Sequence, residues 1–488
     1  MKNLKKLTIL HSNDMHGDFL QEQIDDKLVG GVSMLSGYIN KVRAEEPNTI
    51  YAIAGDMFRG SVIDSEYLGL STIEIMNMIA PDVVTLGNHE TDYGLSHLLF
   101  IEKCAQFPII NANLHITLNN ARLFKPYHII ELDGMKILFI GILTEEVMSQ
   151  TKNDGLVGSV VNVEEAAAEV GKICNAFKGV DIDFTVLLTH IGHEEDKQLA
   201  ALLDPAWGVD VIIGGHSHTF IDEPAKVNDI LIVQAGTGTD QIGRFDIMVD
   251  TDNNCVDSYT WRAVPIDDSH CPRDPQVEEL IAGFKEKTDL KYNRVITRFR
   301  RELTHPVREQ ETALGGLLAD ILKDSLGLDI FLMGSGSLRA TKMGPIVTYG
   351  DLCTAFPYDD AAYAYYITGA QLKEMLRYMV RDEVWAGQHN EFFQLTEGLN
   401  VTYNRTTHQF ERFDFNGAPI EDEKVYSVGL QKFHHDNFED DFHVSRAEVE
   451  ANKKPHIVST SCTQILEEVL SQGHNQDREI SGRLVLVD

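Results

Sequence analysis

The sequence predicts an α/β protein with much parallel strand pairing, and two observations carry this prediction. Short apolar runs, typical of buried strands, alternate along the first half with segments whose apolar residues recur at helical spacing. Polar residues with the chemistry of ligands follow directly after five of these runs. Alternating strands and helices indicate a parallel sheet, and such sheets bind ligands beyond the carboxyl ends of their strands.

Local patterns give the order of the elements. Apolar runs predict strands at residues 6–10, 50–54, 83–86, 108–111, 135–143, 184–188, 209–213 and 230–235. Helical spacing predicts helices from residue 32 to just before Pro47 and at 70–80, 96–105 and 163–177. A further helix at 275–285 precedes a second region, in which helices are predicted around Leu314–Leu322 and Leu372–Met379. The length of 488 residues agrees with two or three domains.

Charge and composition exclude several classes of function. The formal charge of −33 repels nucleic acid and anionic membrane surfaces, so we expect neither as a partner. No apolar run approaches the ~18 residues of a membrane span. The apolar part of the N-terminus is too short for a secretory signal, and the six cysteines have no metal-site spacing. These features together predict a cytoplasmic protein with reduced thiols.

The polar clusters at the strand ends have the composition of a metal site. Two of them place two ligands at positions i and i+2, on one side of an extended segment. The seven candidate ligands are Asp14, His16, Asp56, Asn88, His190, His216 and His218. A single zinc ion takes three or four ligands, whereas seven suit two ions that share a carboxylate. Mixed nitrogen and oxygen donors favour Mn, Zn or Fe, and such a pair can turn a bridging water into hydroxide.

The stretch Gly87–Asp92 adds a second kind of chemistry. It contains an amide oxygen in Asn88, an imidazole in His89 and a carboxylate in Asp92. These groups suit a metal ligand, a proton donor and an orienting partner for that donor. Asn88 and His89 are adjacent and must point in different directions, which separates His89 from the metal ligands.

The ordered blocks resemble the calcineurin-like metallophosphoesterases. The blocks are Asp14-x-His16, Gly55-Asp56, Gly87-Asn88-His89-Glu90, Thr189-His190 and Gly215-His216-Ser217-His218. The second half contains the blocks Gly334-Ser335-Gly336-Ser337-Leu338-Arg339 and Ile367-Thr368-Gly369-Ala370-Gln371-Leu372. In these blocks it is similar to the substrate domain of the bacterial 5′-nucleotidase, UDP-sugar hydrolase and cyclic-phosphodiesterase family.

The resemblance implies a four-layer αββα catalytic domain at residues 1–274, a connecting helix and hinge at 275–304, and a smaller α/β substrate domain at 305–488. It implies one ion held by Asp14, His16, Asp56 and His218, and a second held by Asp56, Asn88, His190 and His216. The catalytic dyad of the family falls on His89 and Asp92. For the substrate it implies Arg308, Arg339, Tyr358 and Phe438, where Phe438 is a choice for the second of two aromatic rings that enclose a nucleobase.

Departures from the family leave the substrate open. Gly334 replaces the usual Asn, and the usual glycine-rich block near the C-terminus is replaced by Phe433–Phe442, where we expect His434 and His435 on a surface loop. We expect metal-dependent hydrolysis of nucleotide phosphoesters of the 5′-nucleotidase type. A 2′,3′-cyclic nucleotide phosphodiesterase and a nucleotide-sugar pyrophosphatase are alternatives, and a nucleotide-binding sensor without turnover is an alternative of another class.

Overall fold

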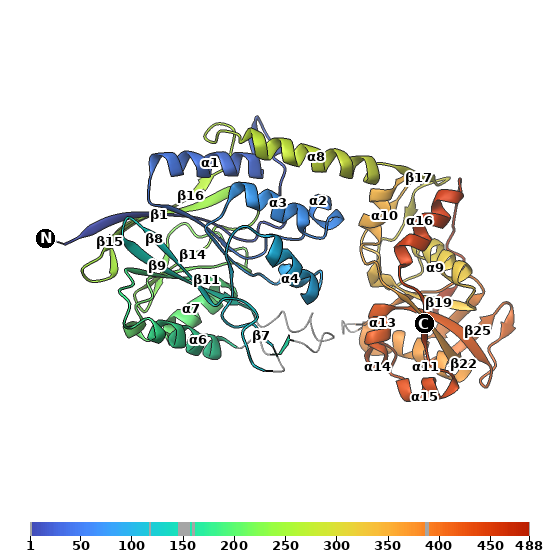
Figure 1. Ribbon diagram of the computed structural model, residues 1–488. Helices are drawn as coiled ribbons and strands as arrows, with labels where there is room; N and C mark the ends of the chain where they lie inside the picture. The colour runs from blue at the N-terminus through green and yellow to red at the C-terminus, as the bar shows by residue number, and fades with distance from the viewer. Residues whose placement is uncertain (1, 117–118, 145–156, 159–161, 386–389, 488) are drawn as a thin grey trace. The chain divides into compact units, whose positions relative to one another are not determined.

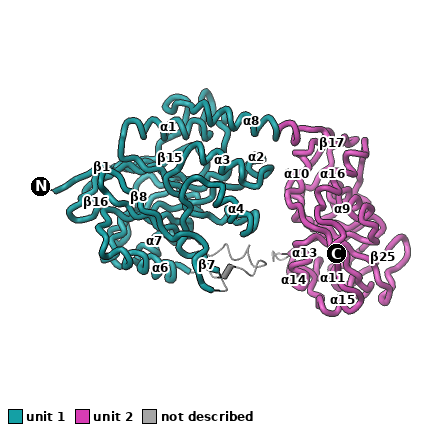
Figure 2. The backbone as a smooth tube through the Cα atoms, viewed as in Figure 1, with its two compact units in different colours: residues 1–288 teal, residues 289–488 magenta. Residues whose placement is uncertain are grey.

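The computed structural model of the chain describes residues 2–116, 119–144, 157–158, 162–385 and 390–487. Its contacts divide the chain into two compact units, residues 1–288 and 289–488, which Figure 2 shows in different colours. The division falls within helix α8 (Pro275–Tyr292), inside the segment 275–304 that the sequence predicts as the connection. Each unit is described by itself below.

Unit 1 contains two six-stranded sheets, some of whose strands are labelled in Figure 1. The first has the order β16-β15-β1-β4-β5-β6, with parallel strands β1 (Leu4–Ser12), β4 (Thr49–Ala54), β5 (Val83–Thr85) and β6 (Ile109–Ile110). β15 (Gln241–Asp250) and β16 (Cys255–Pro265) complete it in antiparallel pairing. The second sheet has the order β13-β14-β12-β11-β9-β8, with parallel strands β9 (Met135–Leu143), β11 (Phe184–His190), β12 (Val211–Ile213) and β14 (Ile230–Val233). Its antiparallel edges are β8 (Tyr127–Leu132) and β13 (Ala225–Val227).

The two sheets pack face to face between layers of helices. A core cluster joins Leu7 and Ile50 of the first sheet to Phe139 and Val186 of the second, and all four are fully buried. The outer face of the first sheet is covered by α1 (Val32–Glu45), α3 (Leu70–Ile79), α4 (Leu95–Cys104) and α8. The outer face of the second is covered by α6 (Val163–Ala176) and α7 (His193–Leu202). This is the predicted αββα order, and burial on both faces explains why the strands are continuous apolar runs.

Unit 2 is also α/β. Its larger sheet has the order β23-β19-β27-β22-β28, formed by β23 (Phe393–Gln394), β19 (Ile330–Gly334), β27 (Val425–Gln431), β22 (Ala362–Thr368) and β28 (His456–Ser459). A four-stranded sheet is formed by β26 (Ala418–Pro419), β25 (Gln409–Phe415), β24 (Leu399–Asn404) and β29 (Leu484–Val487). The predicted apolar stripes are buried in α9 (Ala313–Leu326) and α11 (Gly369–Met379).

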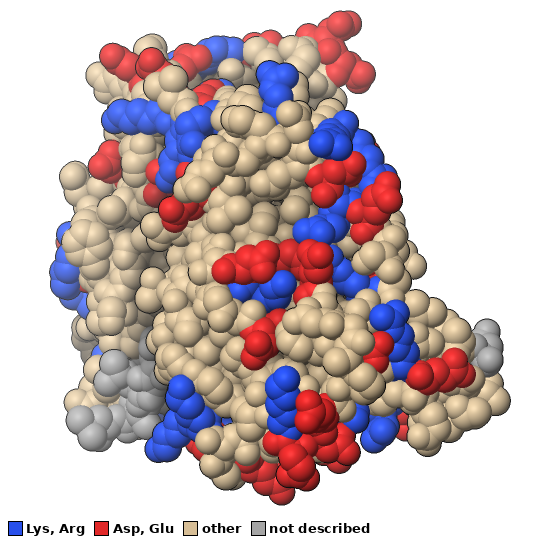
Figure 3. Space-filling model, turned by 90° about the vertical axis from the view of Figure 1, so that its right-hand side faces the viewer, with Lys and Arg blue, Asp and Glu red and all other residues tan. Residues whose placement is uncertain are grey.

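The surface carries charge of both signs. On the face shown in Figure 3, acidic side chains lie beside basic ones. None of the described helices is long and apolar enough to cross a membrane. All six cysteines are free thiols, as the sequence predicts.

Candidate metal centre and substrate cavity

Seven side chains converge at the carboxyl ends of the parallel strands of unit 1. Asp14 and His16 follow β1, Asp56 follows β4 and Asn88 follows β5. From the second sheet, His190 ends β11, and His216 and His218 follow β12. Both sheets therefore contribute to one edge. Three groups of carboxylates and imidazoles at this edge have ligand atoms within 4.8 Å of one another, and together they contain Asp14, His16, Asp56, His89, His190 and His218.

The first set of ligand atoms surrounds Asp14 and His16. The Nε2 atoms of His16 and His218 are 3.0 Å apart, and Nε2 of His218 is 3.4 Å from Oδ1 of Asp14. Nε2 of His16 is 4.0 Å from Oδ1 of Asp14 and 4.0 Å from Oδ2 of Asp56. Two imidazole nitrogens this close need a proton or a cation between them, because their lone pairs otherwise repel.

The second set surrounds His190 and Asn88. Nε2 of His190 lies 3.1 Å from Oδ2 of Asp56 and 3.2 Å from Oδ1 of Asn88. Nδ1 of His216 lies 2.9 Å from the same Asn88 oxygen. Nδ1 of His190 donates to the carbonyl of Ala54 at 2.8 Å, which leaves Nε2 to face the carboxylates. Asp56 thus has neighbours in both sets, as a bridging ligand must.

The backbone at the ligands is strained. Five of the seven ligand residues have a positive φ, namely Asp14, His16, Asp56, His216 and His218. This left-handed conformation costs free energy in residues with a side chain, and it concentrates at functional sites. Gly87 allows Asp56 to approach, because a Cβ there would lie 2.1 Å from Oδ1 of Asp56. The backbone conformation of these loops therefore brings the candidate ligands close together.

A buried glutamate clasps two of the ligand loops together. The carboxylate of Glu90, 2% exposed, accepts hydrogen bonds from the backbone of Asp56 at 2.9 Å, Met57 at 2.7 Å and Gly87. Burial and the charge of Asp56 raise the pKa of Glu90 to about 7. Asp56 and Met57 lie more than thirty positions upstream of Glu90, so the local sequence does not indicate this role.

The carboxylates of the site require positive charge. Asp14 and Asp56 are 0% and 2% exposed. Burial lowers the pKa of His190, but the charges of Asp56 and Asp14 outweigh burial and raise it to about 9. Burial raises the pKa of Asp56, but the interactions of its carboxylate with His190 outweigh burial and lower this pKa to about 2. Divalent cations would supply this charge through the same atoms, so the residues present fit a pair of metal ions.

His89 stands beside the ligands and has its own partner. Its Nδ1 lies 2.7 Å from Oδ2 of Asp92, and its ring meets that of His16 edge to face at 5.3 Å. The hydrogen bond to Asp92 raises the pKa of His89, while burial opposes this. The imidazole therefore holds a proton more readily than a free histidine does. Nε of Arg59 donates to the same Asp92 oxygen at 2.7 Å, a contact that the sequence does not indicate.

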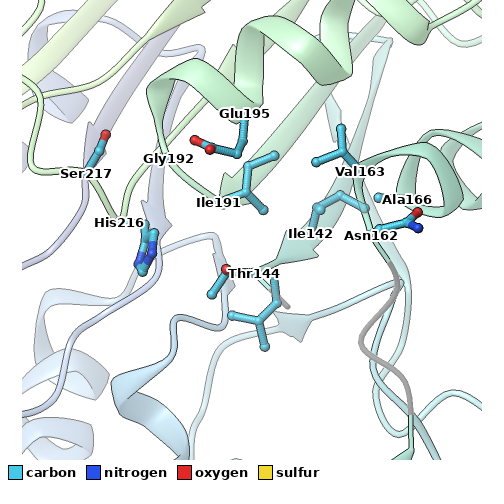
Figure 4. A pocket seen from close by; sticks show the side chains of 11 residues that line it. Ile142, Thr144, Asn162, Val163, Ala166, Ile191, Gly192, Glu195, His216 and Ser217 are labelled. Carbon is cyan, nitrogen blue, oxygen red and sulfur yellow. The ribbon is translucent and has the colours of Figure 1, made fainter. Parts of the chain in front are cut away.

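A cavity of about 360 Å³ adjoins His216 (Figure 4). Its wall is apolar at Ile142, Val163 and Ile191, and polar at Glu195 and Ser217. Figure 4 shows His216, Thr144 and Ile191 around the same space. Unit 1 thus has room for a bound group next to one of the ligands.

Unit 2 contains a cavity of about 380 Å³ lined by three of the four predicted substrate residues, Arg308, Arg339 and Tyr358. The guanidinium of Arg339 lies 5.2 Å from the ring centroid of Tyr358, and its Nε donates to the tyrosine oxygen at 3.1 Å. Phe433 also lines the cavity, and its side chain is 49% exposed. A cavity with two aromatic rings and planar cations suits a ligand that has both a ring and an anionic group.

The structure contradicts the prediction for Phe438. This residue is 1% exposed in α14 (Phe438–Phe442), and its ring stacks on Tyr365 at 4.8 Å. It belongs to the core and is absent from the residues that line the cavity. Phe438 and Phe442 are four positions apart, so one face of a helix buries both. Phe433, in the same segment of the chain, lines the cavity instead.

The expected surface loop at His434 and His435 is also wrong. His434 is 1% exposed in α13 (Lys432–Asp436), and its Nδ1 pairs with Asp441 at 2.8 Å. The imidazole occupies the space beside Gly334, where a Cβ would lie 2.2 Å from Nε2 of His434. The departure at Gly334 and the unusual segment 433–442 are therefore one packing arrangement.

Two family models match consecutive parts of the chain. Residues 7–220 match the calcineurin-like phosphoesterase, and residues 292–442 match the 5′-nucleotidase, C-terminal domain. The first match contains all seven ligands, and the second contains Arg308, Arg339 and Tyr358.

Among similar proteins, the trifunctional nucleotide phosphoesterase YfkN of Bacillus subtilis is 29% identical over 419 residues. The match covers 76% of this chain but only 27% of YfkN, so this chain corresponds to about a quarter of that protein. The 5′-nucleotidase of Vibrio cholerae is 26% identical over 448 residues, which cover 81% of this chain and 79% of the relative.

Solved structures agree in fold. A 5′-nucleotidase precursor from Thermus thermophilus matches with a TM-score of 0.64 and 23% identity, covering 99% of this chain and 100% of that one. A 5′-nucleotidase described as putative, from Staphylococcus aureus, matches with a TM-score of 0.66 and 16% identity over 99% of this chain and 100% of that one. At these identities the likeness concerns the fold alone. The two family matches show a calcineurin-like phosphoesterase domain followed by a 5′-nucleotidase C-terminal domain, and the converging candidate ligands lie in the first of them.

Proposed function

We propose that this protein hydrolyses phosphoester bonds of small nucleotides at a centre of two divalent cations. The observation that carries the proposal is the convergence of two buried carboxylates, an amide oxygen and four imidazoles at one edge of unit 1. The names of relatives such as the Vibrio cholerae 5′-nucleotidase support the substrate class.

Two neighbouring sets of residues would hold the ions. Asp14, His16 and His218 form one set, Asn88, His190 and His216 form the other, and Asp56 stands between them. Nitrogen and oxygen donors in this mixture favour Mn, Zn or Fe. When bound, such ions supply Lewis acidity and lower the pKa of a coordinated water.

His89 and Asp92 would act on the substrate beside the ions. Asp92 engages Nδ1 of His89, which leaves Nε2 to reach the substrate. With its pKa raised, His89 keeps a proton that it can donate to the leaving oxygen as the ester bond breaks. The same positive charge stabilises the negative charge that develops on the phosphoryl group. Attack by water then requires no protein nucleophile.

The cavity of unit 2 would bind the nucleotide. Tyr358 and Phe433 offer rings for the base, and Arg308 and Arg339 offer cations for an anionic group. Base stacking on aromatic side chains contributes ~1–3 kcal/mol per base in nucleic-acid-binding proteins. The predicted hinge at 275–304 is part of this proposal, since the substrate must reach the ions of unit 1.

The cavity beside His216 supports one hydrolytic alternative. A nucleotide sugar carries a nucleoside at one end of its pyrophosphate and a sugar at the other, and about 360 Å³ next to a candidate ligand offers space for one of them. A sensor without turnover is less well supported, because it would need neither His89 nor Asp92.

A substrate panel tests the proposal. The purified protein is stripped of metal, reloaded with Mn²⁺, Zn²⁺ or Fe²⁺, and offered mononucleotides, 2′,3′-cyclic nucleotides, UDP-glucose and non-nucleotide phosphate esters. We expect phosphate release from mononucleotides only with metal present. Binding without turnover of any of these compounds would favour the sensor, and preference for cyclic nucleotides or UDP-glucose would favour an alternative hydrolase.

A further inference from the structure

Arg59 follows the central ligand Asp56 by three positions and shares the unusual backbone of the ligand residues. Its φ is 66°, in a region that long side chains rarely adopt. The next residue, Gly60, has a φ of 136°, and a Cβ there would lie 2.3 Å from the carbonyl oxygen of His16. The loop thus packs directly on a ligand segment, and its strain places Arg59 beside the site.

One carboxylate oxygen joins Arg59 to the proposed proton donor. Oδ2 of Asp92 lies 2.7 Å from Nε of Arg59 and 2.7 Å from Nδ1 of His89. The guanidinium and the imidazole are therefore neighbours across a single oxygen. This bond uses Nε of Arg59, and the Nη donors that point away from Asp92 can reach another acceptor.

A second carboxylate, Asp64, holds the backbone of Arg59 and the ring of Tyr93. Fully buried Asp64 accepts from the backbone N–H of Arg59 at 3.0 Å and from the hydroxyl of Tyr93 at 2.9 Å. The guanidinium lies 5.5 Å from the centroid of the Tyr93 ring. Hydrogen bonds thus hold the backbone and the Nε atom of Arg59, although the side chain is 48% exposed. A fixed and accessible cation is suited to binding an incoming anion.

We propose that Arg59 contacts a non-bridging oxygen of the phosphoryl group through its Nη donors, while its Nε keeps Asp92 and His89 in place. The inference rests on the proposed function, since it needs a phosphoryl group among the seven ligands. Arg59 would add a permanent positive charge to a centre whose other charged side chains are carboxylates and imidazoles.

A double-mutant cycle separates substrate contact from support of Asp92. Arg59→Ala and Asp92→Asn are made singly and together, and inorganic phosphate binding to the metal-loaded proteins is measured by calorimetry. We expect Arg59→Ala to weaken phosphate binding by about tenfold to a hundredfold, the scale of a charged hydrogen bond. Because Arg59 and Asp92 are in contact, the factor should differ between the two backgrounds, but it should persist without the Asp92 carboxylate. Loss of the effect in the Asp92→Asn background, or unchanged phosphate affinity, would overturn the inference.

Controls keep the result interpretable. Arg43→Ala removes another arginine of unit 1, which pairs with Asp82 at 2.9 Å, and should leave phosphate binding unchanged. Arg59→Lys keeps the charge but loses the planar fork, so its phosphate affinity should lie between those of the wild type and Arg59→Ala. It replaces Arg59→Ala in the cycle if the alanine variant does not fold or hold metal. Phosphate binding needs no turnover, so a protein inactive on every ester can still support the role of Arg59.

Discussion

The ligand edge of unit 1 and the cavity of unit 2 hold their polar side chains in different ways. At the ligand edge, Asp14 and Asp56 are buried, and backbone groups and Glu90 hold them. In the cavity, Tyr358 and Phe433 are 44% and 49% exposed, and Arg339 pairs with Tyr358 itself. The first arrangement is fixed before substrate arrives, whereas the second can adapt to its ligand.

This difference predicts which side chains determine the turnover rate and which determine the substrate affinity. A rigid group that stabilises only the transition state changes kcat, while a contact made equally in the ground state changes KM. Changes at the ligand edge should therefore affect turnover, and changes in the cavity should affect substrate affinity.

The largest effect is expected from Asp56→Ala. Asp56 has neighbours in both ligand sets, so its loss should remove metal and lower turnover by about a thousandfold or more, corresponding to several kcal/mol. Metal analysis of the purified variant, together with phosphate release, measures both. A variant that keeps two ions and full activity would show that Asp56 is not a ligand shared by both ions.

His89→Asn should separate chemistry from metal binding. The variant keeps a polar side chain but cannot donate the proton of an imidazolium, so we expect turnover to fall ~10²-fold or more, with metal content unchanged. Steady-state kinetics beside metal analysis give the two values. Turnover equal to that of the wild type would show that His89 does not act on the substrate.

Gly334→Ala tests whether the packing between Gly334 and His434 in unit 2 is rigid. The new Cβ would lie 2.2 Å from Nε2 of His434, so the free energy of unfolding of the variant should fall by ~1–3 kcal/mol, the usual cost of overpacking. Urea denaturation measures it. Gly316→Ala is the matched control, because the new Cβ would lie 3.5 Å from its nearest side-chain neighbour, Nη1 of Arg483, so this variant should be tolerated.

The smallest effect is expected from Phe433→Ala. Removing an exposed ring from the cavity should raise KM about fivefold, near the lower end of stacking energies, and leave kcat unchanged. Phe438→Leu provides the contrast, because this buried ring contributes to stability and should leave KM unaltered. If KM instead rises for Phe438→Leu alone, the original assignment of Phe438 as the stacking residue is restored.

The sequence predicts the ligand edge well for a physical reason. Parallel strands bring their carboxyl ends to one edge, so residues such as Asp14 and His216, two hundred positions apart, can be placed together from local patterns. The four-layer order follows from the same alternation. Glu90 and Arg59 could not be predicted, because their contacts depend on backbone turns with positive φ and on partners across the loops.

The substrate side was predicted less well. Arg308, Arg339 and Tyr358 line one cavity, but the choice of Phe438 over Phe433 failed because aromatic residues serve cores and cavities alike. Only packing distinguishes the two uses, and packing at Phe433 depends on how α13 follows β27. The cytoplasmic location stays a prediction, which cell fractionation can test.

The clasp made by Glu90 has a consequence for how the centre is assembled. Its hydrogen bonds connect the turn after β4 to the turn after β5 through protein atoms alone, so these two turns should keep their positions without bound ions. Chelated protein should therefore remain folded and regain activity when cations are returned. Because these hydrogen bonds constrain the length of both turns, we expect insertions and deletions among related sequences to fall elsewhere in the chain.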